Sequence, residues 1–455
     1  ISLLISLILV SIFSSFKSET KAATSDIYPV KVSVTYGQTE ARKMLGKINS
    51  FRTGNEAWYW NSDNKTKTKC KNLGKLKYDY NLEQIAMQRA AEIAFQFSHE
   101  RTDGTSCFTC NYKNTSSYGE NIATGKGKYL ETATSAFNIW KEDKEKYIGQ
   151  GHRRNMLSSY TSIGIGHVYY KGYHYWVQEF GFTNGTTEVQ ANNSKKSVSV
   201  NVLSSKLKKK SVTVKQKSII INCKSTANVP LLSGKIVFSR ECFPSGAEHS
   251  VVPVAVWKSQ NEKIAKITKG KIEGIYPGKT NITATVLGKN ITIPVTVKAI
   301  DIKGAKLVLN QNRFEYDKTE KKPIVSVTLN GKVLTEDDYN IIYSNNIEVG
   351  SATVTVKGKG CYAGTLTKKF EIYCEHKDTI EIDAGKPATC MKNGITEGSH
   401  CTYCNSIVVK QNIIKALGHD NDIEVHRITT TRQNGLATFT CKRCGYVLEN
   451  ETIYS

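Results

Sequence analysis

"GENIA" at residues 119–123 follows "SHERTDG" at 98–104 and precedes "GHRRNML" at 151–157. These stretches bring a carboxylate, Glu120, and two imidazoles, His99 and His152, into one short region of a 455-residue chain. Imidazole and carboxylate are the groups with which proteins bind transition metals and transfer protons near neutral pH. The patterns around the three stretches therefore decide both the fold and the candidate site.

The segments that flank these stretches show helical periodicity first and strand periodicity later. Apolar residues recur at helical spacing in residues 41–52, 82–97 and 129–140. Residues 162–181, "SIGIGHVYYKGYHYWVQEFG", alternate apolar positions around a Lys-Gly step, which predicts two strands joined by a turn. Helices followed by an antiparallel hairpin predict a mixed α and β domain over residues 39–183, and we expect it to fold by itself.

Four motifs in this domain resemble the signatures of the CAP superfamily, in its bacterial SCP-domain form. They are "FSHERTDGTSCFT" (97–109), "YGENIA" (118–123), "GHRRNML" (151–157) and "YWVQEFG" (175–181). The superfamily comprises cysteine-rich secretory proteins, antigen 5 and plant pathogenesis-related proteins. The resemblance covers residues 39–183 and implies an α-β-α sandwich, within an α+β chain.

The resemblance also implies a shallow cleft lined by two histidines and two acidic residues. His99, His152 and Glu120 match three of these positions. The fourth acid follows a tryptophan in the family, and here the insertion "KEDKEKYIGQ" after Trp140 leaves Glu142 and Asp143 as alternatives. The cleft candidates are thus His99, Glu120, His152 and Glu142.

Such a group of side chains has three possible roles. It can hold a divalent metal such as zinc through His99, His152 and Glu120, with an open coordination position. It can act as general acid and base in an extracellular hydrolase. It can also be a hydrogen-bonded network that orders loops. No Ser or Cys nucleophile is placed beside a base, because Ser98 adjoins His99 only in sequence, so we expect binding rather than catalysis.

Three cysteines lie in this domain: Cys70, Cys107 and Cys110. The Cys-x-x-Cys pair can be a redox pair or half of a metal site. We expect instead that one of the two forms a structural disulfide with Cys70.

Both the N-terminus and the composition indicate an extracytoplasmic protein. Residues 1–25 open with "ISLLISLILVSIFSSF" and have the apolar core and polar exit of a secretory signal peptide. No later run is long and apolar enough to predict a transmembrane span. The formal charge of +23 comes mostly from scattered lysines and is accompanied by no nucleic-acid-binding motif, so we expect no nucleic acid partner. The expected setting is the extracellular space or cell envelope of a Gram-positive bacterium.

After a polar linker at residues 184–198 the pattern changes to alternation with a period of two. Residues 199–299 resemble a bacterial Ig-like domain, and residues 300–373, here the second β module, resemble another all-β unit. We expect both to be spacers, and an adhesin that binds through them is an alternative function. Cys223 and Cys242 are expected to join strands, and Cys361 to be a buried free thiol.

Residues 374–455 contain a degenerate repeat in which a histidine opens each copy and Cys-x-x-Cys closes it. His376, Cys401 and Cys404 match His419, Cys441 and Cys444, and the first copy has two further cysteines, Cys374 and Cys390. These eight side chains are enough for two tetrahedral zinc sites. Disulfides are the alternative in an oxidising compartment. The matched histidines favour zinc, which is the cofactor expected for both cleft and tail.

Overall fold

A two-stranded hairpin, β8 (Ser162–Tyr170) and β9 (Tyr173–Gly181), is the centre of the N-terminal fold. Its turn residues Lys171 and Gly172 have φ values of 50° and 82°, the left-handed geometry that suits a tight hairpin with twisted strands. The computed structural model describes residues 27–240 and 243–454. The predicted signal peptide, residues 1–25, lies outside the described residues.

Two glycines of β8 allow helix α3 (Tyr80–Ile93) to lie directly on the hairpin. A Cβ atom on Gly164 would lie 2.1 Å from the backbone nitrogen of Glu83, and one on Gly166 would lie 2.2 Å from the carbonyl oxygen of Ala86. Asp79 begins the helix, because its carboxylate accepts hydrogen bonds from two N–H groups of the first turn. The two glycines therefore leave the room on one face of β8 that α3 needs in order to pack against it.

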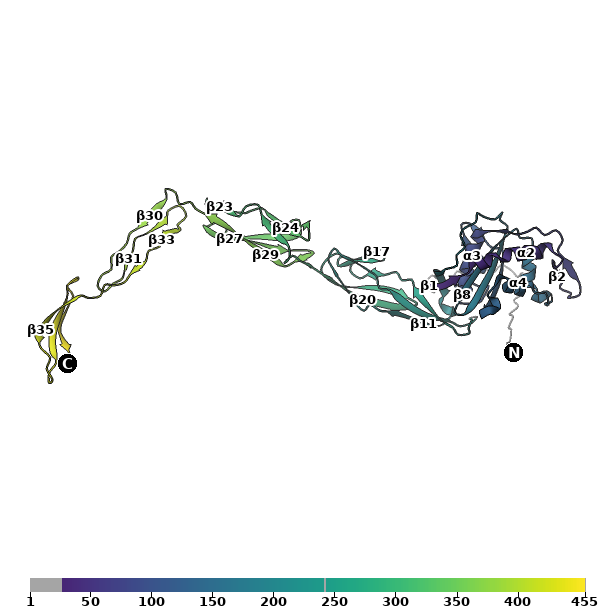
Figure 1. Ribbon diagram of the computed structural model, residues 1–455, viewed down its shortest axis with the longest axis horizontal. Coiled ribbons are helices and arrows are strands. Elements are labelled where there is room, and N and C mark those ends of the chain that lie inside the picture. Colours follow the sequence, from purple (N-terminus) through teal and green to yellow (C-terminus); the bar gives the residue numbers. More distant parts are fainter. Residues whose placement is uncertain (1–26, 241–242, 455) are drawn as a thin grey trace. The chain divides into compact units, whose positions relative to one another are not determined.

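The opposite face of the hairpin is covered by the remaining helices, and Figure 1 shows α2 and α4 beside β8. These helices are α1 (Gln38–Arg42), α2 (Met44–Thr53), α4 (Ala133–Lys141) and α5 (Gly151–Met156). Ile163 and Ile165 of β8 point into this core, where they join Trp140 and Trp176. All four of these side chains are 0 % exposed. Helices thus lie on both faces of the sheet.

The hairpin belongs to a nine-stranded sheet that extends beyond the predicted domain. β7 (Gly119–Lys126) is one edge, and the order is β11-β14-β15-β1-β8-β9-β7, with β10 also on β1 and β4 on β8. β1 (Ile27–Tyr36) pairs with β10 (Lys195–Leu203) over nine residues. Residues 195–198, predicted as linker, are therefore strand. The described residues up to Ile221, with Ser225–Val297, form one unit.

The other strands of this first unit vary from two to ten residues in length. They are β2 (Trp58–Trp60), β3 (Lys67–Lys69), β4 (Lys77–Tyr78), β5 (Asn111–Tyr112), β6 (Thr115–Ser116), β11 (Leu207–Val214), β12 (Ile219–Asn222), β13 (Thr226–Asn228), β14 (Leu232–Phe238), β15 (Glu248–Pro253), β16 (Lys258–Ser259), β17 (Ala265–Thr268), β18 (Lys271–Gly274), β19 (Gly278–Val286) and β20 (Lys289–Lys298). β12, β20, β19 and β16 form one sheet, and β13, β18 and β17 form another.

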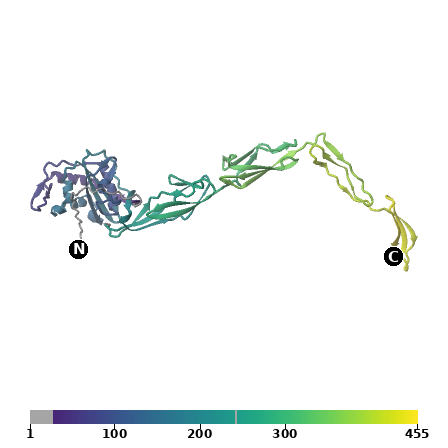
Figure 2. The same ribbon diagram turned by 180° about the vertical axis from the view of Figure 1, so that it is seen from behind.

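The second unit, Asn222–Lys224 with Lys298–Ser455, consists of strands, turns and loops in its described part, as Figure 2 also shows. The strands are β21 (Ile300–Asp301), β22 (Lys306–Leu309), β23 (Arg313–Glu315), β24 (Val325–Leu329), β25 (Lys332–Val333), β26 (Tyr339–Ser344), β27 (Gly350–Gly358), β28 (Tyr362–Ala363), β29 (Thr365–Tyr373), β30 (Ile380–Asp383), β31 (Gly394–Ile395), β32 (Gly398–Cys401), β33 (Ile407–Val409), β34 (Ile413–Ile414), β35 (Asn421–Arg427), β36 (Gly435–Cys441) and β37 (Val447–Ile453). A mixed N-terminal region followed by a β-rich remainder confirms the coarse fold class.

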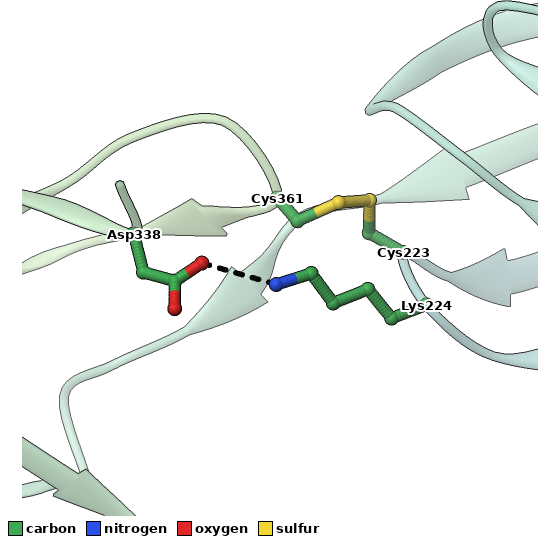
Figure 3. The surroundings of a disulfide bond; sticks show 4 residues. All are labelled: Cys223, Lys224, Asp338 and Cys361. Atoms are coloured by element: carbon green, nitrogen blue, oxygen red, sulfur yellow. Dashed lines mark hydrogen bonds and ion pairs between the residues drawn. A yellow bond between two sulfur atoms is a disulfide. The ribbon is translucent and has the colours of Figure 1, made fainter. Parts of the chain in front are cut away.

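A disulfide joins Cys223 to Cys361 across 138 residues of sequence, and the ammonium of Lys224 pairs with Asp338 beside it at 3.0 Å (Figure 3). The prediction that Cys361 is a free thiol is therefore wrong. Sequence spacing had no means to reveal this pairing, because the two cysteines come from segments that only the folded chain brings together. Cys242, the partner predicted for Cys223, lies outside the described residues.

None of the helices that the structure describes is both long enough and apolar enough to cross a membrane.

Candidate functional site

His99 and Glu120 form a hydrogen-bonded pair at the end of β7. His99 lies in the segment after α3, and its Nδ1 donates to Glu120 Oε1 over 2.8 Å. The His99 side chain is 48 % exposed, whereas that of Glu120 is 1 % exposed. A buried carboxylate therefore orients an imidazole that faces solvent.

Arg89 of α3 fixes the charge of Glu120. Its Nε lies 2.7 Å and its Nη2 3.3 Å from the two carboxylate oxygens, and its Nη1 lies 2.8 Å from Glu92. Arg101 pairs with the same Glu92. Burial by itself opposes ionisation of Glu120, but the charge of Arg89 and the hydrogen bond from His99 outweigh it and lower the pKa to about 2. Glu120 is thus an anion with both oxygens engaged.

Glu179 lies directly opposite Glu120 on the neighbouring strand β9. It is fully buried, and burial, followed by the negative charge of Glu120, raises its pKa well above the ordinary carboxyl value. Two adjacent carboxyl groups therefore differ in protonation, with Glu120 charged and Glu179 neutral.

His152 and Glu142 form a second pair of the same kind. His152, on α5, donates from Nδ1 to Glu142 Oε1, and the backbone N–H of Arg153 donates to Glu142 Oε2 at 3.1 Å. Glu142 directly follows α4 in a left-handed conformation, with φ of 49°. Asp143, the alternative from the sequence, instead pairs with Lys141 and Arg153. The geometry thus assigns the histidine-binding role to Glu142.

Side-chain amides connect the strand of Glu120 to the helix of His152. Asn155 donates to the carbonyl oxygen of Glu120 at 3.3 Å, and Asn121 donates to the carbonyl oxygen of His152 at 3.2 Å. The four predicted cleft residues nevertheless form two pairs and not a single cluster. Among the described residues, the ligand atoms that gather within 4.8 Å of one another here belong to His99, Glu120 and Cys107.

The two pairs have a consequence for ligand binding. A histidine that donates from Nδ1 to a carboxylate presents the lone pair of Nε2 outward, which is how proteins orient imidazoles toward metals. In this geometry Glu120 and Glu142 each hold one histidine ring through its Nδ1. The structure therefore favours an orienting role for Glu120 over the ligand role predicted from the sequence, because Arg89 and His99 already occupy its oxygens.

The cysteines of this region are thiols in the structure, so the predicted disulfide to Cys70 is wrong. Cys70 packs against the core on the α2 and α4 side, whereas Cys110 packs with Leu82 and Ile85 of α3 on the other side of the sheet. Burial, and then the charge of Glu120, raises the pKa of Cys107, and burial with Glu92 raises that of Cys110 to about 12. Neither thiol is an activated nucleophile.

A groove lies away from both pairs. It has a volume of about 810 Å³ and runs between α2 and the start of α4, with Phe51 and Phe137 in its wall. Glu40 and Lys43 lie at its rim, where they form a 2.7 Å ion pair. Neither His99 nor His152 lines it. The histidine pairs thus lie on a separate, solvent-accessible surface.

The tail contains two further clusters, and together they account for all eight predicted ligands. One consists of Cys374, His376, Cys401 and Cys404, and the other of Cys390, His419, Cys441 and Cys444. In each cluster the ligand atoms lie within 4.8 Å of one another. All six cysteines are free thiols in the structure. The sequence predicted the eight residues but not their division between the clusters.

The distances inside the clusters suit a tetrahedral zinc ion. Two Zn–S bonds of about 2.3 Å at the tetrahedral angle place the sulfurs about 3.8 Å apart, and a Zn–S with a Zn–N bond places S and N about 3.6 Å apart. Cys390 and Cys441 Sγ are 3.6 Å apart. Sγ of Cys404 lies 3.6 Å from His376 Nδ1, and Sγ of Cys444 lies 3.5 Å from His419 Nδ1. A disulfide requires about 2.05 Å.

Both Cys-x-x-Cys turns have the same backbone. The N–H of Asn405 bonds the carbonyl of Cys401, and the N–H of Gly445 bonds that of Cys441. Asn405 and Gly445 both have positive φ, 57° and 72°, which a knuckle turn needs after its second cysteine.

One sulfur in each turn also has the charge state that a metal needs. The hydrogen bond from Thr379, aided by His376, lowers the pKa of Cys401 to about 5. For Cys441, the hydrogen bond from His419 outweighs the effect of burial and lowers the pKa to about 5. Thiolates at neutral pH are ready to bind metal.

Comparison with protein families identifies the N-terminal region. Residues 45–180 match the family model described as CAP: Cysteine-rich secretory protein family. This match supports a CAP domain. It spans all four predicted cleft residues, namely His99, Glu120, Glu142 and His152. CAP proteins are typically extracellular and often bind extracellular partners.

The other comparisons add no further relative. No curated protein matches the chain. Among solved structures, S-layer protein SbsC domains 5–6 share 15 % identity over 37 % of this chain and 98 % of that one, with a TM-score of 0.14. Protocadherin Gamma B2 cadherin domains 3–6 share 11 % identity over 64 % and 75 %, with a TM-score of 0.16. Scores this low carry no argument about this chain.

Proposed function

We propose that residues 39–183 form an α-β-α CAP domain that binds an extracellular partner, and that the β modules 199–299 and 300–373 present it as Ig-like spacers. The CAP family match and the helices on both faces of the sheet support the domain assignment. The protein is secreted or held in the envelope of a Gram-positive bacterium. Its partner is a host protein, a lipid or a cell-wall polymer.

The observation that carries this proposal is the pair of carboxylate-oriented histidines. His99 and His152 each use Nδ1 for a carboxylate that is at most 11 % exposed, and their own side chains are 48 % and 33 % exposed. We assign the divalent metal, zinc, to these two Nε2 atoms, with coordination positions left open for a donor group of the partner. Glu120 and Glu142 position the rings.

The same geometry favours binding over the hydrolase alternative. The hydroxyl of Ser98, which adjoins His99 in sequence, accepts a hydrogen bond from the N–H of Glu100, and burial with the charge of Glu120 raises the pKa of the Cys107 thiol. A hydrolase that forms a covalent intermediate needs a hydroxyl or thiol hydrogen-bonded to its base.

We also propose that the two tail clusters bind zinc as structural ions. Each offers three cysteine sulfurs and one imidazole, a donor set typical of structural zinc. The distances given above support tetrahedral coordination over disulfide bonding. Because the described residues of 417–454 include few buried apolar side chains, among them Ala437 and Cys441, the metal supplies much of the folding free energy of that segment.

A sedimentation assay tests the binding function. The full chain is incubated with isolated Gram-positive wall sacculi or with phosphatidylglycerol vesicles, and the bound fraction is compared for wild type and His99→Ala/His152→Ala. His426→Ala, an exposed histidine outside the CAP domain, is the control. We expect the double variant to lose binding to one of the two probes. Equal binding by the double variant and the control would place the function on the β modules, as the adhesin alternative requires.

A further inference from the structure

The first tail cluster lies where the chain leaves the second β module. Cys374 directly follows β29 (Thr365–Tyr373), a strand of that module. Cys401 and Cys404 pack into the same apolar cluster as Phe370 and Ile372 of β29. Tyr403, between them, packs edge-to-face on Tyr316 at 5.5 Å. The first ligand set thus lies at the boundary between the second β module and residues 374–416, here called the first tail repeat.

The second cluster has a different source for its fourth ligand. In residues 417–455, the second tail repeat, Leu417 stands two residues before His419, where the first repeat has Cys374 two residues before His376. The second repeat therefore lacks one sulfur. Cys390 of the first repeat supplies it, 51 residues before Cys441.

Backbone hydrogen bonds place Cys390 at the vacant position. The N–H of Leu417 donates to the carbonyl of Thr389 at 2.9 Å, and the N–H of Gly418 donates to that of Cys390 at 3.1 Å. Cys390 is therefore paired with the segment that lacks the cysteine. Arg443, inside the second Cys-x-x-Cys, donates to the carbonyl of Leu417 at 3.1 Å from the other side.

The turn that carries Cys390 is held within the first repeat. The N–H of Thr389 donates to the carbonyl of Lys392. Lys386 and Ile395 exchange two backbone hydrogen bonds, each donating its N–H to the carbonyl of the other. A Cβ on Gly394 would lie 2.4 Å from the backbone nitrogen of Ala388, so this turn is packed on itself. Cys390 is presented by a structured part of the first repeat and not by a free loop.

We propose that the second tail zinc ion is shared between the repeats, with Cys390 of the first repeat as one ligand and three ligands from the second. The ion then fastens the second repeat to the first, as the ion at Cys374 fastens the first repeat to the second β module. This inference rests on the zinc assignment made above. It adds that the second site depends on the first repeat, whereas the first site does not depend on the second repeat. The second site needs an intact first repeat, whereas the first site contains no residue of the second repeat.

Zinc content is measured by native mass spectrometry on full chains that all carry His99→Ala/His152→Ala, so that only tail ions are counted. Below, wild type refers to the tail. We expect two tail zinc ions in the wild type, one in Cys390→Ser and one in Cys444→Ser. In both variants the first repeat stays resistant to trypsin while the second is cut. Cys374→Ser removes the first ion and weakens the second, because it loosens the repeat that presents Cys390. Cys70→Ser, a thiol outside the tail, retains two ions.

A rescue variant separates the loss of a ligand from misfolding. Leu417→Cys in the Cys390→Ser background places a sulfur two residues before His419, as in the first repeat, and we expect it to restore the second ion. A wild-type chain without zinc would refute the zinc assignment itself. A Cys390→Ser chain that still holds two ions would leave that assignment intact and overturn the sharing.

Discussion

The sulfur atoms of Cys390 and Cys441 lie 3.6 Å apart although the two residues belong to different tail repeats. This separation is close to that of two thiolates on one tetrahedral ion and far from that of a disulfide. The structure thus places a cysteine of the first repeat beside the Cys-x-x-Cys turn of the second, which has Leu417 where the first repeat has Cys374. The tail is therefore organised by its ligands more than by an apolar core.

Chelation is expected to unfold the tail while the first unit stays folded. Removing the ions with a chelator withdraws the binding free energy that holds residues 374–455 together, so amide exchange there rises strongly. A mild reductant without chelator leaves that exchange unchanged, because no disulfide holds the tail. Protection lost with reductant and kept with chelator would establish disulfides instead.

Arg89 is expected to be a stability determinant of the CAP domain. Arg89→Met leaves the buried carboxylate of Glu120 without its arginine and leaves Glu92 with Arg101 alone, which costs about 3–5 kcal/mol of unfolding free energy. All five tryptophans lie in the first unit, so urea unfolding followed by tryptophan fluorescence reports on it. Adding Glu120→Gln recovers part of the loss. A change of less than 1 kcal/mol in Arg89→Met would contradict this role.

The first unit is expected to lose stability in mild acid because two buried histidines are neutral. Burial lowers the pKa of His167, with His174 adding to the effect, and that of His249, with Lys171 adding to it, each to about 4. The unfolded chain takes up these protons near pH 6.5. The stabilisation is therefore complete above about pH 6.5 and is lost as the pH falls toward 4, with a slope of up to about 1.4 kcal/mol per pH unit for each histidine.

His249→Phe tests this pH dependence directly. His249 contacts Phe95, Tyr170 and Phe238, so an aromatic ring fits its surroundings. Thermal unfolding between pH 7 and 4, followed by tryptophan fluorescence, should show a shallower decline for the variant. Parallel curves for wild type and variant would mean that His249 is not the group that takes up a proton.

The CAP domain is expected to require β1 and β10. Val30, Val32 and Val34 of β1 are buried, and this strand contributes to the sheet next to β8. A fragment of residues 27–203 should therefore unfold cooperatively, whereas 39–183 exposes the edge of β8 and unfolds at a lower temperature. Circular dichroism melts compare the two. Equal melting temperatures would support the shorter domain predicted from the sequence.

Features that depend on local sequence patterns could be predicted, whereas the pairing of distant segments could not. The Lys171–Gly172 hairpin and the helices before it follow from periodicity and turn chemistry, which act over a few residues. The pairing of β1 with β10, residues 27–35 with 195–203, has no local signature. Neither has the Cys223–Cys361 bond, because both depend on how separate segments pack.

The site was predicted in the same uneven way. His99, Glu120 and His152 follow from motifs, but Arg89, which holds Glu120, was missed. A signal was present: Ile85, Arg89 and Ile93 share one helix face, and a charged residue on a buried face needs a buried partner. In the tail, all eight candidate ligands could be named from the sequence. The second repeat has Leu417 at the position that Cys374 occupies in the first repeat. The meaning of this difference became clear only when the structure placed Cys390 beside the second repeat.

The most direct test of the proposed function is a zinc titration of the full chain, already saturated at its tail sites, by isothermal calorimetry. Metal bound through Nε2 of His99 and His152 predicts uptake of one further ion, which either His99→Ala or His152→Ala abolishes. Glu142→Gln weakens the uptake, because it removes the acid that orients His152. His426→Ala leaves it unchanged. Further uptake that persists in both His99→Ala and His152→Ala, or no further uptake by the wild type, would contradict the account.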